Sequence, residues 1–235
     1  MEILVVGSGG REHAIIKKLK ESPLCGKIHC APGNGGIEAE GALCHPVKAG
    51  DLRGVLALAK EIAPDFVVVA PDDPLVLGLV DLLEENGFAC FGPSKAAARL
   101  EGSKVFSKGL MKKYGIPTAQ YEVFTGAGAA GDWIRANQNY PLVLKADGLA
   151  LGKGVLIAES EEEALQAVQT LMEDKKFGES GSQIVIEEFL RGPEVTALCL
   201  TDGETIRPLA SSMDHKRALD GDLGLNTGGM GTIAP

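Results

Sequence analysis

Two lysines and three glycines lie close together at residues 145–154, Lys-Ala-Asp-Gly-Leu-Ala-Leu-Gly-Lys-Gly. Glycine lets main-chain N–H groups approach phosphate oxygens, and lysine supplies positive charge to balance them. The chemistry that these residue types suggest is the binding of a polyanion such as a nucleotide phosphate chain. Apolar runs flank the stretch at 142–144 and 155–158. The pattern therefore predicts a strand, a glycine-rich loop and a second strand.

A P-loop would be one explanation of this stretch, and it requires G-x-x-x-x-G-K-[ST] between a strand and a helix. The spacing from Gly148 to Gly152 and Lys153 is one residue short. Gly154 also stands where the Ser or Thr belongs, and a strand is predicted to follow. The stretch therefore fits a hairpin whose tip folds over ATP. A strand ending at 187–190, Glu-Glu-Phe-Leu, would offer backbone groups to adenine and a carboxylate to ribose.

A second glycine-rich loop, Gly-Ser-Gly-Gly-Arg-Glu-His at 7–13, follows the apolar run 3–6 and precedes a predicted helix. The dinucleotide fingerprint G-x-G-x-x-G is only half met, because Glu12 takes the last glycine position, so a nicotinamide cofactor is not expected. Two interpretations stay open: a phosphate bound at the helix N-terminus, or a tight turn without a ligand. His13 is similarly open between binding and local packing.

Two further predicted strands end in loops of the same kind, Ala-Pro-Gly-Asn-Gly-Gly at 31–36 and Pro-Asp-Asp-Pro at 71–74. In open α/β sheets, ligands bind at the carboxyl ends of the strands. Residues 1–102 are therefore predicted to form a doubly wound parallel-sheet domain with a substrate site along that edge. We expect one helix at 51–63, capped by Asp51, and one helix from about 75 to Asn86.

Residues 103–235 are predicted to form a second domain, of the α+β class, with a lid subdomain at about 120–190. Its expected elements are a helix opening at 100–104 and ending near 114, a strand at 121–124, a helix at 132–139, the hairpin, a helix at 160–174, a strand at 183–190 and two strands around the turn at 202–203. The chain is expected to stop at Pro235 in loop-like sequence.

Composition limits the function classes that remain. The 235 residues carry 23 Lys and Arg against 32 Asp and Glu, a net charge of −9, so no nucleic-acid groove is expected. The five cysteines show no zinc-ligand spacing, which is typical of reduced thiols in a cytoplasmic protein. The N-terminus is too short and acidic for a signal peptide, and no apolar run is long enough to predict a membrane span.

Several motifs together resemble the ATP-grasp ligases and, among these, the glycinamide ribonucleotide synthetase (phosphoribosylamine–glycine ligase) family. These motifs lie, in order, at 7–13, 31–34, 100–104, 145–154, 187–190, 214–217 and 226–231, so the resemblance extends over the whole chain. The chain departs from the family pattern at two places. It has Ala70-Pro71-Asp72 where the family usually has Gly-Pro-Glu, and Met213 where the family has Gln.

The resemblance implies a fold and an activity. The fold would be an N-terminal doubly wound parallel-sheet domain of the pre-ATP-grasp type, followed by an incomplete ATP-grasp domain. The activity would be ligation of glycine to 5-phosphoribosylamine in purine biosynthesis, with ATP converted to ADP and phosphate by way of a glycyl phosphate. Catalysis of this kind needs positioning and charge neutralisation and does not need an enzyme nucleophile.

The same resemblance assigns site residues in three groups. Residues implied to bind ATP are Lys104, Lys145, Gly148, Gly152, Lys153, Gly154, Glu187, Glu188, Phe189, Leu190 and Glu194. Residues implied to bind phosphoribosylamine are Gly9, Gly10, Arg11, Glu12, His13, Gly33, Asn34, Pro71 and Asp72. Residues implied to line the glycine and acyl-phosphate centre are Asp214, Lys216, Asn226, Thr227 and Gly228.

The family also uses Mg²⁺ or Mn²⁺, whose ligands the resemblance places beyond residue 235, so it implies no metal ligand among residues 1–235. We expect a monomer that binds small molecules and neither nucleic acid nor membrane. Two alternatives stay open: a catalytically inactive piece that binds ATP or ribose phosphate, and another ATP-grasp ligase of purine synthesis. Lys104 by itself could also be an ordinary solvated lysine.

Overall fold

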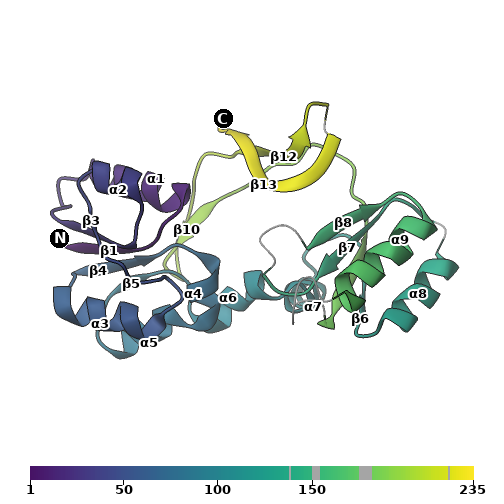
Figure 1. The fold of residues 1–235 in the computed structure, drawn as a ribbon, viewed down its shortest axis with the longest axis horizontal. Coiled ribbons are helices and arrows are strands. Elements are labelled where there is room, and N and C mark those ends of the chain that lie inside the picture. The colour runs from purple at the N-terminus through teal and green to yellow at the C-terminus, as the bar shows by residue number, and fades with distance from the viewer. Residues whose placement is uncertain (138, 150–153, 175–181, 222) are drawn as a thin grey trace. The chain divides into compact units, whose positions relative to one another are not determined.

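The computed structural model describes residues 1–137, 139–149, 154–174, 182–221 and 223–235, without the side chains of residues 225 and 226. The chain divides into two compact units, Met1–Ser103 and Lys104–Pro235. Figure 1 shows the course of the chain through both of them.

The first unit is built on a parallel sheet with the strand order β3-β2-β1-β4-β5. Its strands are β1 (Ile3–Gly7), β2 (Ile28–Pro32), β3 (Leu43–Cys44), β4 (Phe66–Val69) and β5 (Cys90–Phe91). Side chains along β1 alternate between two cores: Leu4 and Val6 lie in one, and Ile3 and Val5 lie in the other. A strand buried on both faces needs such a continuous apolar sequence, so the doubly wound prediction is confirmed.

Helices pack against this sheet and lead away from its strand ends. They are α1 (Gly10–Leu19), α2 (Gly35–Ala39), α3 (Leu52–Ile62), α4 (Asp72–Leu77), α5 (Leu79–Glu85) and α6 (Lys95–Gly102). Asp51 caps α3 as predicted, because its side chain accepts a hydrogen bond from the N–H of Gly54 at 3.0 Å.

Two helix predictions in this region are wrong. The single helix expected from 75 to Asn86 is broken into α4 and α5, because Gly78 takes φ +97, in the left-handed region. The helix expected to open at 100–104 and to end near 114 is in fact two helices, α6 and α7 (Lys104–Tyr114), because Ser103 between them is extended. Local sequence periodicity did not reveal either break.

The second unit contains an antiparallel sheet with the order β6-β9-β7-β8. Its strands are β6 (Tyr121–Phe124), β7 (Leu142–Ala146), β8 (Val155–Ala158) and β9 (Ile184–Glu188), and its helices are α7 (Lys104–Tyr114), α8 (Ala127–Ala136), α9 (Glu161–Val168) and the π-helix η1 (Gln169–Glu173). The predicted hairpin around 145–154 is present as β7 and β8. Helix α8 starts before the predicted 132, and the helix predicted at 160–174 continues from α9 into η1.

The two faces of this sheet differ in character. Leu142, Leu144 and Ile186 lie on the face that packs in one core with residues of α8 and α9, and Figure 1 shows these helices beside β7 and β8. The alternate residues of the strands, among them Lys145 and Glu187, must point to the opposite face. Period-2 alternation thus separates an apolar, helix-covered face from a face that carries charge.

Two further hairpins follow, formed by β10 (Cys199–Thr201) with β11 (Ile206–Pro208) and by β12 (Met213–Leu219) with β13 (Leu223–Ile233). The loop-like character expected for the end of the chain is therefore wrong up to Ile233, where β13 ends. Repeated glycines hid the long strand β13, because glycine lowers strand propensity and leaves few side chains to show alternation. No helix in the part of the chain that the structure describes combines the length and apolarity needed to cross a membrane.

Candidate functional site

The carboxyl edge of the parallel sheet gathers the three loops that the sequence singled out. The N–H of Gly33 donates to the carbonyl of Gly7 at 3.0 Å, and the Asn34 side chain donates to the carbonyl of Ser8 at 2.7 Å. Asn34 also caps α2, because its Oδ1 accepts from the N–H of Ile37 at 3.0 Å. The loops after β1 and β2 are therefore held together by backbone groups and one amide side chain.

The loop after β4 joins the same edge through an ion pair. Strand β4 lies next to β1 on the side away from β2, which makes the gap between β1 and β4 the point where the strand order reverses. At this gap Arg11 and Asp72 are 3.8 Å apart, with both side chains largely exposed. Pro71 precedes α4 at the same strand end. The strand order thus brings Gly9, Gly10, Arg11 and Asp72 to one edge.

Glu12 fills the position where a dinucleotide fingerprint would have glycine. Glu12 is only 5% exposed, and its Oε2 accepts a hydrogen bond from the N–H of Gly9 at 2.6 Å. Gly7 lies against the same side chain, at φ +131. The neighbouring His13 faces Glu40, with Nε2 and Oε1 3.7 Å apart. The structure therefore gives Glu12 and His13 protein partners, and their assignment to substrate binding stays a prediction.

The face of the antiparallel sheet opposite α8 and α9 carries a buried cluster of charge. Glu187 on β9 is 5% exposed, and its Oε2 lies 3.0 Å from the Nζ of Lys145 on β7. The same oxygen lies 3.1 Å from the Nζ of Lys108 on α7. The other carboxylate oxygen, Oε1, is buried without a hydrogen-bond partner among the described residues. A buried acceptor without a partner is costly unless a ligand satisfies it.

Lys108 was missed by sequence reasoning, and one signal could have found it. Lys108 lies four residues after Lys104, so both lysines project from the same side of α7. Lys104 donates to the carbonyl of Gly148 at 2.8 Å, and the Asp147 carboxylate accepts from the N–H of Val105 at 3.1 Å. These two contacts tie the start of the glycine loop to the first turn of α7.

Further residues predicted to bind ATP lie at the end of β9 and next to β8. Glu188 accepts from the N–H of Gln120 at 2.8 Å, while Phe189 and Leu190 are exposed beyond the end of β9. Gly154 is buried and directly precedes β8. Gly152 and Lys153 lie outside the described residues.

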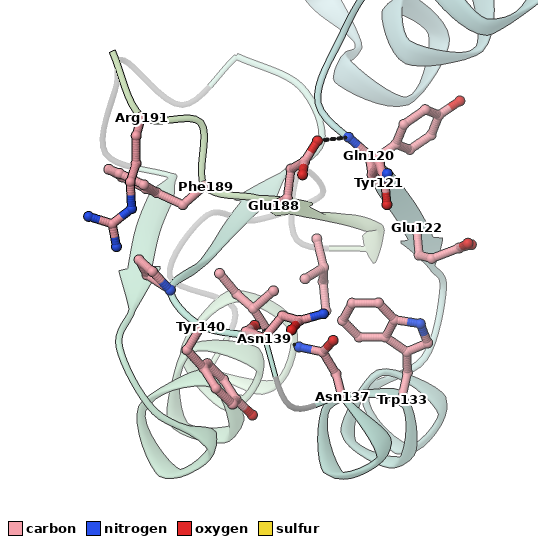
Figure 2. A pocket seen from close by; sticks show the side chains of 13 residues that line it. Gln120, Tyr121, Glu122, Trp133, Asn137, Asn139, Tyr140, Glu188, Phe189 and Arg191 are labelled. Carbon is pink, nitrogen blue, oxygen red and sulfur yellow. Dashed lines mark hydrogen bonds between the residues drawn. The ribbon is translucent and has the colours of Figure 1, made fainter.

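Glu188 and Phe189 also help to line a cavity of about 340 Å³, on the sheet face that carries Leu142 and Ile186. Figure 2 shows Trp133, Tyr140 and Asn139 around it. Because alternate residues point to opposite faces, this cavity is not on the face of Lys145 and Glu187.

The predicted glycine-centre residues lie on the β12–β13 hairpin. Lys216 forms an ion pair with Glu194 and has Asp214 at 3.6 Å; the hydrogen bond to Glu194 is the main reason that the pKa of Lys216 is raised. Thr227 donates to the carbonyl of Lys216 at 2.8 Å. Gly228 is exposed, and the side chain of Asn226 is outside the described residues.

The described residues fit a nucleotide better than a metal ion. Lys104, Lys145 and the partnerless Oε1 of Glu187 supply positive charge and an acceptor near a glycine loop. Among the described residues, no group of three or more His, Cys, Asp or Glu side chains could hold a metal.

A doubly wound sheet followed by an antiparallel sheet with a lysine-bearing glycine hairpin defines an ATP-grasp protein. Two family models match the chain in succession: the N domain of phosphoribosylglycinamide synthetase at residues 1–101, and its ATP-grasp (A) domain at residues 102–235. The chain belongs to the phosphoribosylglycinamide synthetase family. The sequence-based identification of the family is thus confirmed.

Individual relatives agree with this assignment. The phosphoribosylamine–glycine ligases of Agrobacterium fabrum and Yersinia pestis are 52% and 47% identical to the chain, covering 100% of it and 55% of their own lengths. The chain therefore spans about half the length of the curated relatives that it matches. The crystal structure of phosphoribosylamine–glycine ligase from Thermotoga maritima has a TM-score of 0.81 at 37% identity, and the match covers 99% of this chain and 55% of that one.

More distant structures share the fold alone. One is the biotin carboxylase domain of 2-oxoglutarate carboxylase from Hydrogenobacter thermophilus, solved with MgADP and bicarbonate. It is 22% identical, with a TM-score of 0.71, and the match covers 90% of this chain and 49% of that one.

Proposed function

We propose that this chain provides the substrate-binding domain and part of the ATP site of a phosphoribosylamine–glycine ligase. The reaction joins glycine to the amine of 5-phosphoribosylamine, with ATP converted to ADP and phosphate by way of a glycyl phosphate. The observation that carries the proposal is the match of all 235 residues, at about half identity, to ligases of that name. The product would be glycinamide ribonucleotide.

The edge of the parallel sheet would bind the ribose phosphate. Gly9 and Gly10 present backbone at the N-terminus of α1, where the helix dipole favours an anion. The N–H of Gly9 is already used by Glu12, so that of Gly10 and the guanidinium of Arg11 are the better donors toward a phosphate. The hydrogen bond from Asn34 to Ser8 would hold the loops after β1 and β2 together.

The charged face of the antiparallel sheet would bind ATP. Lys145 and Lys104 would neutralise phosphate charge, and the backbone of Phe189 and Leu190, which continues past the last paired residue of β9, would meet adenine. ATP supplies the phosphoryl group that activates the glycine carboxylate. The chain's own residues then have to orient the reactants, exclude water and hold charge, which lysines and backbone groups do well.

The test is a coupled assay of ADP release by the protein at the length of its relatives. The expected result is that ADP release requires glycine and phosphoribosylamine together. Release that does not depend on glycine, or that occurs only with another amino acid or with bicarbonate, would contradict the proposal and favour another ATP-grasp ligase. Mg²⁺ and Mn²⁺ should be compared in the same assay, since the identity of the metal forms part of the proposal.

A second candidate is that these 235 residues bind nucleotide without completing the reaction. It is favoured by the apolar side chains that β10 to β13 leave exposed, among them Leu200, Ile206, Leu223 and Met230. Apolar strands of this kind usually need a covering layer. Calorimetry on the 235-residue chain would support this candidate if ATP bound without any release of ADP, and turnover by that chain would contradict it.

A further inference from the structure

Lys108 is a buried lysine whose donors are all engaged within the protein. Lys108 is 8% exposed, and its Nζ lies 3.1 Å from the Oε2 of Glu187. The same Nζ donates to the Oγ1 of Thr118 at 2.7 Å and to the carbonyl of Ala119 at 3.5 Å, and it lies 5.4 Å from the centre of the Tyr121 ring. An ammonium group has three N–H donors. Lys108 cannot turn toward a ligand without giving up one of these contacts.

Lys145 is arranged differently, although it shares the same carboxylate oxygen. Its side chain is 27% exposed against 10% for that of Lys108. In the described part of the chain its acceptor is the Oε2 of Glu187, at 3.0 Å. Lys145 therefore has donors to offer and a route to solvent, whereas Lys108 has neither.

The charges in this cluster do not balance. Two ammonium groups face one carboxylate, which leaves one positive charge in excess at a site that is mostly shielded from water. A buried carboxylate that loses its last counterion is strongly destabilised. With Lys108 in place, Glu187 keeps a counterion even when Lys145 moves away. Without Lys108, Lys145 would have to remain on Glu187.

We propose that Lys108 is a positioning residue that holds Glu187 so that Lys145 is free to bind the phosphates of a nucleotide. Lys108 acts through Glu187 and Lys145 and does not touch the phosphates itself. This inference rests on the proposed nucleotide site, and it assigns a role to a residue that lies outside the sequence motifs named above.

The test compares ADP with adenosine, since the ratio of their affinities isolates the contribution of the phosphates. Calorimetry is performed on the protein at the length of its relatives and on its Lys108→Met variant. We expect the variant to lose on the order of tenfold to a hundredfold in that ratio, because Lys145 then stays with Glu187. Lys112→Met is the matched control: it lies one turn further along α7 with its side chain exposed, and it should leave the ratio unchanged.

Two double variants separate an indirect role from a direct one. In a Lys145→Met background, Lys108→Met should cause no further loss in the ratio, because the residue through which it acts is gone. In a Glu187→Gln background, Lys108→Met should also have little effect, because no buried carboxylate then needs a counterion. Glu187→Gln also keeps the test open if Lys108→Met alone fails to fold, since the double variant has no buried carboxylate left without a counterion.

Several outcomes would overturn the inference. An unchanged ratio of ADP to adenosine affinity in Lys108→Met would show that Lys145 does not need Lys108 in order to bind phosphate. If the losses of the two single variants multiplied in the Lys108→Met/Lys145→Met variant, Lys108 would contact the phosphates itself. A wild-type protein that does not bind ADP would also overturn it. If ADP binds but its release does not depend on glycine, the proposed reaction fails while the role of Lys108 is still decided by the affinity ratios.

Discussion

At the carboxyl end of β1, Gly7 packs closely against the side chain of Glu12. A Cβ built on Gly7 would lie 2.4 Å from the Cγ of Glu12 and 2.6 Å from its Cδ, and Gly7 has φ +131. The substitution Gly7→Ala should therefore both strain the backbone and push Glu12 away from the N–H of Gly9, which Glu12 binds at 2.6 Å.

The expected magnitude follows from these two effects. Forcing a residue with a Cβ into the left-handed region costs roughly 1–2 kcal/mol, and losing a hydrogen bond to a charged group costs about 1.5–3 kcal/mol. Gly7→Ala should thus cost about 2.5–5 kcal/mol of unfolding free energy. Gly41→Ala is the matched control, because Gly41 has φ +87 and no atom within 4 Å of its Cβ position. It should cost only about 1–2 kcal/mol.

Hydrogen exchange of the β1 amides measures the stability of this sheet without interference from the second unit. If Gly7→Ala costs no more than Gly41→Ala, the reasoning about the Glu12 contact is refuted. A Gly7→Ala/Glu12→Ala double variant gives a further check. It should be no less stable than Gly7→Ala alone, because the bond from Glu12 is already broken in the single variant.

Three other predictions concern single side chains. Lys145→Ala should weaken ATP binding by about tenfold to a hundredfold, measured by calorimetry, while the unfolding free energy changes by less than about 1 kcal/mol because Lys108 still pairs with Glu187; unchanged affinity would remove its assigned role. Burial and a neighbouring imidazole lower the pKa of His45 below its ordinary 6.5, so stability should fall as the pH drops below that value, where the unfolded chain takes up a proton first. His45→Gln should reduce that decline in pH-dependent urea titrations, and an unaltered slope would contradict the argument. Burial raises the pKa of the Cys30 thiol to about 12, whereas Cys199 is exposed; iodoacetamide at about pH 8 should modify Cys199 and spare Cys30 in peptide mass spectra.

Much of the fold follows from local sequence patterns. The buried strands β1 and β4 and the hairpin β7–β8 were predicted from apolar runs with glycine loops beside them, because strand character and turn chemistry are properties of a few neighbouring residues. Helix breaks were harder to predict. Gly78 separates α4 from α5 and Ser103 separates α6 from α7, yet both positions look compatible with a continuous helix until the packing of their flanks is known.

The candidate site also combines residues that the sequence predicted with contacts that only the structure shows. Sequence motifs pointed to Lys145, Glu187 and Asn34, because glycine loops and strand ends mark such positions. The ion pair between Arg11 and Asp72 depends on the strand order, which sets β4 beside β1. The residues around one strand do not reveal which other strands will pair with it.

The sequence by itself determined the family, the doubly wound class of the first unit and the lysine-bearing hairpin of the second. These depend on residue types at short spacing, where chemistry and local geometry act together. Only the tertiary structure decided that Glu12 caps its own loop and that Lys108, on a helix some eighty residues before Glu187, shares that carboxylate with Lys145. The physical reason is that burial and charge pairing arise from long-range contacts, so a lysine that no sequence motif marks becomes the counterion of a buried acid when the chain folds.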